Sequence, residues 1–421
     1  MAIEKCKGTR DMSPSDMARF RAIEDAFRDV CLKWGYDEVR TPTLEYLYLF
    51  TAAGTLTPGK LGRVYSFLDW DGWSGERVVL RPDGTIPIAR YYIETNRDAR
   101  LARLFYVNNV FSFEETGTET REKWQCGAEL IGAGSTAADV ELVLMALETL
   151  KKLGLKDVEL KLTHAGLIRA ILSGIKSSTE EQTKLFDRVL DGDTKALVEA
   201  RPELANIVTP ILTSKGKSSG FLKNVSVMVG NDVPELKEPI ENFTELAATL
   251  DALGTPYEID IASGRGFEYY TGLIFQVWSC GEMVAGGGRY DDLIPLLGGT
   301  STPASGFALY VDKLMGIIGG RRTESAANKI MVRSVSGQAG TKEAFEIVNA
   351  LHDAGFAAQI ASADVGIEGA GTKWVVETSD TGWHFGLRDV DSGDLYEVAT
   401  VDEVVDRLRE RNQGGPGQIQ E

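Results

Sequence analysis

The hydrophobic positions near the start of the chain repeat with helical spacing and are followed by a short extended stretch. Apolar side chains recur at intervals of three to four residues over 15–33, and Ser13 and Ser15 are available as N-caps. Gly35 ends this pattern, and the next segment, Tyr36–Arg40, reads as a strand. We therefore expect the chain to open with an amphipathic helix that leads into a strand.

Two pairs of apolar segments predict antiparallel hairpins farther along the chain. The first pair is Leu104–Phe113 and Trp124–Ile131, with a loop at 116–120. In the second pair, the apolar run Ile274–Trp278 is separated by a turn from a cluster of three glycines at 286–288. Because glycine is disfavoured inside strands, we expect a ligand or another backbone to lie close against the sheet here.

The remaining pattern divides the chain into a core, a terminal domain and a tail. We predict a core over 1–322, with a mainly helical insertion at about 165–255. Strands and helices alternate within 323–410, which predicts a small α/β domain, and 411–421 is expected to be a disordered tail. The core is further predicted to contain helices at 86–94 and 137–153, a strand at 157–162, a loop at 214–220, and a glycine turn leading into a helix over 304–314.

Composition and charge narrow the range of compartments and partners. The chain has 421 residues and a formal net charge of −17. No apolar run reaches the about 18 residues needed to span a membrane, and the N-terminus lacks the apolar core of a signal peptide. Four cysteines and three histidines are scattered without the spacing of a metal site, which favours a reducing cytoplasm. The acidic charge makes tRNA an unfavourable partner, although a local basic patch would still permit it.

The glycine cluster stands near side chains suited to holding a polar ligand. Arg265 precedes the second hairpin, and Tyr269, Tyr270 and Tyr290 accompany it. An arginine can grip a planar carboxylate or phosphate with two parallel hydrogen bonds, and each tyrosine adds a polar tip to an aromatic ring. The combination favours a ligand pocket. For any single glycine, a buried hairpin in which glycine eases packing is the simpler interpretation.

Several of these segments resemble signatures of histidyl-tRNA synthetases. Arg265-Gly266-x-x-Tyr269-Tyr270-Thr271-Gly272 and Gly287-Gly288-Arg289-Tyr290-Asp291 resemble the histidine-binding signature, which persists in a paralogous family, the regulatory subunits of ATP phosphoribosyltransferase. The resemblance implies an α+β fold: a class II aminoacyl-tRNA synthetase-like antiparallel sheet core flanked by helices. It also implies that the small C-terminal α/β domain is a shortened anticodon-binding domain. The opening helix and strand, followed by Thr41-Pro42-Thr43-Leu44-Glu45, resemble motif 1, the dimer interface of that family.

The same resemblance assigns side chains to a histidine pocket. Gln125-Cys126-Gly127-Ala128-Glu129 resembles a segment that lines this pocket, and Gln125 and Glu129 share one strand face because they are four residues apart. Asp83 stands in place of a glutamate that faces the ammonium group of the amino acid, and Tyr270 and Tyr290 are expected to place hydroxyls at the rim. The implied histidine-binding residues are Asp83, Thr85, Arg121, Gln125, Glu129, Arg265, Tyr269, Tyr270 and Tyr290.

Two positions depart from the pattern of an active synthetase. Ser112 stands where motif 2 places an arginine on the α-phosphate of ATP, and Lys313 stands where motif 3 places an arginine on the adenine and γ-phosphate. Removing one preorganised donor of this kind costs on the order of 100- to 1000-fold in rate. Lysine keeps the positive charge but lacks the planar fork of arginine. The two ATP-binding positions are therefore read as lost.

An amino-acid pocket without nucleotide-binding arginines favours a non-catalytic regulatory subunit of ATP phosphoribosyltransferase, which needs no cofactor. The resemblance then implies a short-form catalytic subunit as partner, a homodimer formed through motif 1, L-histidine as a ligand, and a role in the first step of histidine biosynthesis. An active or degenerate histidyl-tRNA synthetase is the first alternative. An amino-acid-binding paralogue with another partner is the second.

Overall fold

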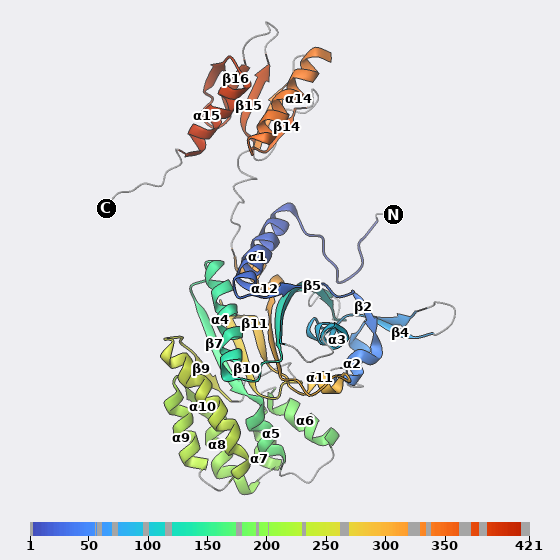
Figure 1. Cartoon of the computed structure of the whole chain (residues 1–421), viewed down its shortest axis with the longest axis vertical. Helices are drawn as coiled ribbons and strands as arrows, with labels where there is room; N and C mark the ends of the chain where they lie inside the picture. The colour runs from blue at the N-terminus through green and yellow to red at the C-terminus, as the bar shows by residue number, and fades with distance from the viewer. Residues whose placement is uncertain are drawn as a thin grey trace. The chain divides into compact units, whose positions relative to one another are not determined.

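The computed structural model divides the chain into two compact units, Met1–Gly319 and Gly320–Glu421, and each is described by itself. In the first unit a mainly antiparallel sheet is flanked by helices (Figure 1), and the described residues of the second unit form a smaller sheet with two helices. The structure describes residues 3–54, 56, 61–69, 75–95, 101–113, 120–173, 179–190, 193–200, 202–229, 233–261, 269–318, 329–333, 338–361, 372–378 and 385–413.

The first unit is built on a nine-stranded sheet. From β5 to β7 every neighbouring pair is antiparallel, and only β1–β5 and β7–β9 pair in parallel. The two predicted hairpins are confirmed, because β5 pairs with β6 and β10 pairs with β11. In sheet order the strands are β1 (Asp37–Glu38), β5 (Ala102–Phe111), β6 (Glu122–Ile131), β12 (Ala304–Tyr310), β11 (Glu282–Arg289), β10 (Leu273–Ser279), β7 (Val158–His164), β9 (Glu258–Asp260) and β8 (Lys215–Gly216).

One face of this sheet is covered by α1 (Pro14–Lys33), α4 (Thr136–Lys152) and α12 (Val311–Ile317). Helix α1 begins at a capping box in which Ser13 and Asp16 satisfy each other's backbone N–H groups. Its apolar stripe, which includes Phe27, is buried in the core as the helical spacing predicts. The other face is approached by α3 (Thr85–Thr95), against which α11 (Leu293–Leu296) packs.

The helical insertion lies beside the β7–β9 end of the sheet (Figure 1). The segment 214–220 was predicted to be a loop. This is wrong in part, because β8 pairs with β9 there and helix α9 starts at Ser219. The insertion contains α5 (Ala165–Ser173), α6 (Thr179–Leu190), α7 (Thr194–Ala200), η2 (Pro202–Leu204), α8 (Ala205–Thr213), α9 (Ser219–Val229), η3 (Pro234–Leu236) and α10 (Lys237–Ala252).

The predicted turn at the start of 304–314 is wrong, because residues 304–310 form strand β12. This strand pairs with both β6 and β11 in the middle of the sheet, which fixes it in an extended conformation. Gly306 lies opposite Glu129 on one side and Gly288 on the other. The glycine is therefore required for close packing inside a strand and does not form a turn.

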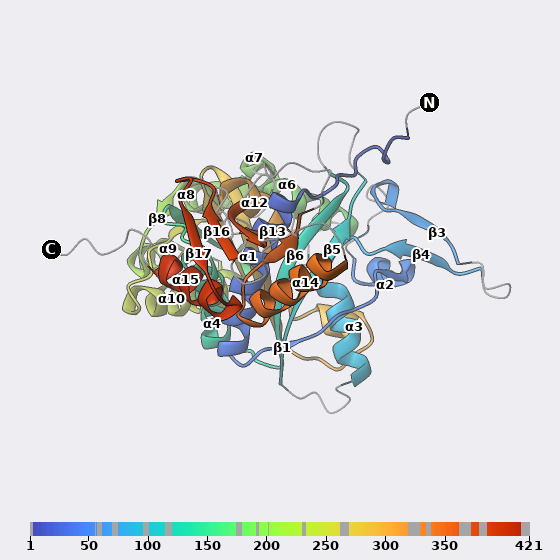
Figure 2. The same ribbon diagram turned by 90° about the horizontal axis from the view of Figure 1, so that it is seen from above.

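A small three-stranded sheet projects beside the large one (Figure 2). Its order is β2 (Leu44–Tyr46), β4 (Arg77–Leu80) and β3 (Ser66–Leu68), and α2 (Leu47–Ala52) and η1 (Leu61–Arg63) accompany it. Several large apolar side chains on this sheet and on α2 are exposed: Leu44, Tyr46, Tyr48, Phe67 and Leu68.

The second unit has five strands in the order β14 (Ala358–Ile360), β13 (Lys329–Arg333), β15 (Thr372–Thr378), β16 (Phe385–Asp389) and β17 (Leu395–Val398). Helices α14 (Gln338–Asp353) and α15 (Val401–Gln413) accompany them, in the predicted alternation. The start of the predicted tail at 411 is wrong, because α15 continues to Gln413. The guanidinium of Arg411 donates a hydrogen bond of 2.6 Å to the hydroxyl of Tyr396, which holds this last turn. None of the helices described in either unit is long and apolar enough to cross a membrane.

Candidate functional site

Glu129 is buried on the face of the large sheet that α3 approaches. Its carboxylate accepts hydrogen bonds from the hydroxyl of Thr85, at 2.8 Å, and from the hydroxyl of Tyr290. Burial raises the pKa of Glu129 to about 8, although these two hydrogen bonds oppose the shift. Gly306 makes room for the carboxylate, since a Cβ there would overlap it. At neutral pH the carboxyl therefore keeps its proton unless a cation lies beside it.

Three tyrosines form an aromatic wall next to Glu129. The ring of Tyr269 lies 4.9 Å from that of Tyr270 and 5.6 Å, edge-on, from that of Tyr290. Burial raises the pKa of all three phenols, so each hydroxyl stays neutral and can donate a hydrogen bond. The expectation that Tyr270 and Tyr290 lie at the rim is wrong: both are buried, and Tyr290 points inward because its hydroxyl bonds to Glu129.

Asp83 lies near the same carboxyl at the start of α3. One of its oxygens accepts the backbone N–H of Ile86 at 2.8 Å, so the residue caps the helix. Burial raises the pKa of Asp83, and its charge in turn raises the pKa of Glu129. Two neighbouring carboxyls that both resist ionisation form a site in which a cation would be stabilised.

The structure adds Tyr106, which the sequence analysis did not select. Its ring is packed between Gly84 and Gly127, and a Cβ at either glycine would overlap it. Its hydroxyl is buried and has no hydrogen-bond partner among the described residues. The sequence pointed to Tyr106 only indirectly, through Gly84 and Gly127, which stand within the segments that resemble pocket motifs.

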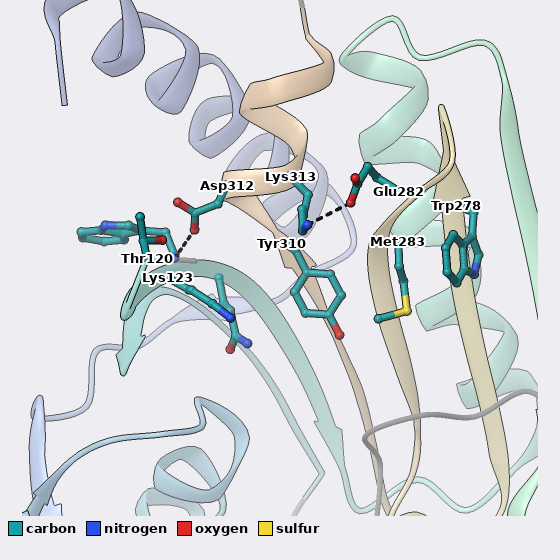
Figure 3. A pocket seen from close by; sticks show the side chains of 10 residues that line it. Thr120, Lys123, Trp278, Glu282, Met283, Tyr310, Asp312 and Lys313 are labelled. Atoms are coloured by element: carbon teal, nitrogen blue, oxygen red, sulfur yellow. Dashed lines mark hydrogen bonds and ion pairs between the residues drawn. The ribbon is translucent and has the colours of Figure 1, made fainter. Parts of the chain in front are cut away.

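Gln125 lines a neighbouring cavity of about 740 Å³, together with Tyr310, Trp278 and Met283 (Figure 3). Gln125 on β6 and Tyr310 on β12 are directly opposed in the sheet, and Tyr310 points into the cavity. Tyr310 was also missed by the sequence analysis, because the segment that contains it was expected to be a glycine turn leading into a helix and not a strand with alternating faces.

The same cavity contains the position where motif 3 of a synthetase has its arginine. The ammonium of Lys313 lies 2.9 Å from the carboxylate of Glu282, a pair drawn in Figure 3. The neighbouring Asp312 accepts the backbone N–H of Trp124 at 2.7 Å and is also paired with Arg10. The charged side chains that line this cavity are Lys123, Glu282, Asp312 and Lys313, and their formal charges cancel, so the cavity offers no excess of positive charge to a polyphosphate.

The remaining candidate positions lie apart from Glu129 or outside the described residues. The guanidinium of Arg121 lies 4.2 Å from the centre of the Phe113 ring and donates a hydrogen bond of 3.2 Å to the hydroxyl of Tyr65. The backbone N–H of Ser112 donates to the carbonyl of Arg121 within the β5–β6 hairpin. Arg265 lies outside the described residues.

The glycines at 286–288 approach other parts of the protein. A Cβ at Gly287 would overlap the carbonyl oxygen of Gly306, and a Cβ at Gly288 would overlap that of Leu273 and lie 2.9 Å from the ring of Tyr270. Of the two explanations offered for this cluster, close approach of a neighbouring backbone is confirmed.

Comparisons with known proteins agree with this geometry. Residues 8–314 match a family model described as histidyl-tRNA synthetase. The chain belongs to the histidyl-tRNA synthetase family. The predicted class II synthetase-like fold is confirmed by two solved family structures, each with a TM-score of 0.77. One, from Bacillus halodurans, is described as an ATP phosphoribosyltransferase regulatory subunit/histidyl-tRNA synthetase; it is 24% identical, and the match covers 90% of this chain and 98% of that one. The other is a histidyl-tRNA synthetase from Nostoc; it is 18% identical, and the match covers 98% of this chain and 100% of that one.

Within the histidyl-tRNA synthetase family the chain is more similar to a regulatory subunit than to a ligase. It is 49% identical to the ATP phosphoribosyltransferase regulatory subunit of Dehalococcoides mccartyi, over 95% of this chain and 94% of that one. It is 32% identical to the histidine–tRNA ligase of Methanosarcina acetivorans, over 97% and 99% of the two chains. The comparisons therefore favour the regulatory interpretation over the ligase.

Proposed function

We propose that this chain is a non-catalytic regulatory subunit of ATP phosphoribosyltransferase and is needed for the first step of L-histidine biosynthesis. One structural observation carries the proposal beyond the similarity to named regulatory subunits. Thr85 and Tyr290 both direct their hydroxyls at Glu129, whereas the position of the motif 3 arginine holds a lysine already paired with Glu282. Such a chain can bind an amino acid but is poorly equipped to activate it with ATP.

L-Histidine is the proposed ligand of the Glu129 pocket. Its ammonium group is placed near Glu129 and Asp83, where the positive charge offsets the cost of ionising buried carboxyls. The family resemblance assigns Arg265 to the polar imidazole side and counts Gln125 among the residues that line the pocket. Binding at this pocket would give the complex a sensor for the end product of its own pathway.

The proposed assembly contains a homodimer and a short-form catalytic subunit located in the cytoplasm. The exposed apolar side chains on β2, β3 and α2 adjoin the segment that resembles motif 1, and the rings of Tyr46 and Tyr48 stack there at 5.3 Å. A cluster of large exposed apolar groups is typical of a protein interface. The catalytic residues of the transferase belong to the partner, and this chain contributes structure and feedback.

Mixing the purified protein with a short-form catalytic subunit tests the proposal most directly. We expect phosphoribosyl transfer from phosphoribosyl pyrophosphate to ATP to rise on mixing, and the two chains to co-elute in size-exclusion chromatography. An intact histidyl-tRNA synthetase of similar size serves as the control partner and should have no effect. If neither activity nor elution changes, and the protein instead charges tRNA with histidine, the ligase interpretation is correct.

A further inference from the structure

A second cavity lies on the opposite side of the sheet from Glu129, between the sheet and the helical insertion. It has a volume of about 430 Å³, and we call it the α4–α10 cavity. Its walls come from the start of α4, the ends of β7 and β11, the loop before β10, and residues 238–246 of α10. The residues that matter for its chemistry are Asp139, His164, Glu238, Asn242, Arg289 and Asp291.

Arg289 and Tyr290 show why the two sites are separate. Successive side chains of a strand point to opposite faces of the sheet. The hydroxyl of Tyr290 reaches Glu129, whereas the guanidinium of Arg289 reaches Asp139 on α4, at 2.7 Å. The same guanidinium also bonds to Asp291 and to the carbonyl oxygens of Ala133 and Ser135. Arg289 is thus occupied by the protein and has little capacity left for an anionic ligand.

The polar groups that face the cavity are mainly hydrogen-bond acceptors. His164 is only 8% exposed, lines the cavity, and has an Nδ1 without a hydrogen-bond partner among the described residues. Burial, aided by Arg289, lowers the pKa of His164 to about 4, so the ring is neutral and one of its nitrogens accepts hydrogen bonds. Three acidic side chains, those of Asp139, Asp291 and Glu238, line the cavity together with one guanidinium, that of Arg289, so acidic groups outnumber basic ones there.

We propose that the α4–α10 cavity binds a small aliphatic amine, whose ammonium group is held by the carboxylates of Asp291 and Glu238. An ammonium carries three hydrogen-bond donors and no acceptor, which matches a wall made of carboxylates and an unpartnered imidazole nitrogen. Leu246 and Leu273 supply apolar surface for the carbon chain. This inference is independent of the function proposed above, since the site shares no ligand-facing side chain with the Glu129 pocket.

The position of the cavity suggests what binding would affect. Glu238 and Asn242 lie on α10 of the insertion, whereas Asp291 and Thr271 flank strands of the central sheet. Thr271 directly follows Tyr270 in the chain, and its hydroxyl accepts the backbone N–H of Asp291 at 3.0 Å. A ligand in this cavity would therefore link the insertion to the segment that carries the tyrosine wall of the first pocket.

Three compounds with the same four-carbon chain test the charge preference: 1,4-diaminobutane, 1,4-butanediol and succinate. The full-length protein is labelled with [13C]histidine at Cε1, and its spectrum contains signals from only three histidines. His164→Gln identifies the signal of His164. We expect 1,4-diaminobutane to shift this signal saturably, and we expect equal concentrations of butanediol or succinate to leave it unchanged.

Two tryptophan variants on the exposed side of α10 provide the matched control. Asn242 lines the cavity and Glu241 does not, and both are exposed, so neither substitution should unfold the protein. Asn242→Trp should abolish the saturable shift by filling the cavity, whereas Glu241→Trp should retain it. The proposal is overturned if 1,4-diaminobutane causes no saturable shift in the folded protein, if the three compounds act alike, or if the shift survives in Asn242→Trp.

Discussion

The hydroxyl of Tyr290 donates a hydrogen bond to the buried carboxyl of Glu129, which joins the residue after β11 to the C-terminal part of β6. This bond orders the floor of the first pocket, and Thr85 completes it from the start of α3. Because two donors are already directed at Glu129 before any ligand arrives, the pocket is preorganised for a group that favours the ionised carboxylate.

The first prediction concerns stability and pH. The pKa of Glu129 is about 8 in the folded protein, against an ordinary value of 4.5. At pH values between these two, the folded state keeps a proton that the unfolded chain has released. The stability that this group contributes is complete below its unfolded pKa and is lost as the pH rises through its folded pKa. The corresponding slope reaches at most about 1.4 kcal/mol per pH unit.

Glu129→Gln removes this titration and should flatten the fall in the free energy of unfolding over this pH range. Denaturant titrations at several pH values measure the effect. Glu159→Gln, which removes an exposed carboxyl on β7, should leave the wild-type pH dependence in place. Identical slopes for wild type and Glu129→Gln would show that the carboxyl is ionised in the folded protein.

The second prediction is that the protein does not catalyse histidine-dependent ATP–pyrophosphate exchange. Ser112 cannot supply a guanidinium to the α-phosphate, and Lys313 is held by Glu282 at 2.9 Å. Ser112→Arg alone should not restore exchange, because the second position still lacks a planar cation and keeps an adjacent carboxylate. An active histidyl-tRNA synthetase assayed in parallel is the control. Exchange by the wild-type protein at a comparable rate would refute both this prediction and the regulatory proposal.

The elements with long, regular periodicity could be predicted from the sequence. The 15–33 pattern became α1, and the four strands of the two hairpins formed with small shifts at their ends, because burial of an apolar stripe decides these elements locally. Strand β12 could not be predicted in this way. Its seven residues are extended because β6 and β11 flank them, and both of those strands are distant in the chain.

The site could be predicted only where the residues match a family pattern or share a strand face. Glu129 and Thr85 were selected on such grounds and lie in contact. The inward direction of Tyr290 follows from the neighbouring strands and could not be inferred from its own segment. Tyr106 could not be predicted as a site residue for a related reason: its position depends on Gly84 and Gly127, which lie on other elements.

The third prediction concerns the turn between β10 and β11. Cys280 and Gly281 both have positive φ values, 51° and 78°, as a type I′ hairpin turn requires. A cysteine in this conformation is strained, whereas asparagine tolerates it better. Cys280→Asn should raise the free energy of unfolding by about 0.5–1 kcal/mol, and Gly281→Ala should lower it by about 1 kcal/mol. Urea titration checks both, and equal effects of the two substitutions would contradict the assigned turn.

The fourth prediction is a homodimer that uses the exposed apolar surface of the small sheet and α2. Tyr48 and Phe67 are 60% and 46% exposed, and charges introduced there should prevent a partner from burying this surface. Light scattering should show a dimer for the wild type and a monomer for the double variant Tyr48→Glu, Phe67→Glu. Val227→Glu, at an 82% exposed position on α9, is the matched control and should remain dimeric. A monomeric wild type at micromolar concentration would contradict the prediction.

The last prediction is that the Glu129 pocket binds free L-histidine and releases a proton as it does so. In the absence of ligand the carboxyl is protonated at neutral pH, because burial raises its pKa to about 8. A bound ammonium group favours the ionised form, so the proton leaves for the buffer. Calorimetry in phosphate and in Tris, which differ in their heats of protonation, should therefore give different apparent enthalpies for the same affinity.

Three variants separate this mechanism from general loss of the fold. Glu129→Gln should weaken binding and reduce the buffer dependence, since residue 129 then has no proton to release. Thr85→Val should weaken binding by about 0.5–1.5 kcal/mol through the loss of one hydrogen bond to that carboxyl, while the buffer dependence persists. Arg265→Ala should weaken binding strongly if this guanidinium holds the imidazole, as the family resemblance implies. Leucine should not compete, because it would leave buried polar groups unpaired at about 1–3 kcal/mol each. If millimolar histidine gives no heat in either buffer with folded protein, the pocket does not bind histidine. Any feedback by histidine must then act at another site.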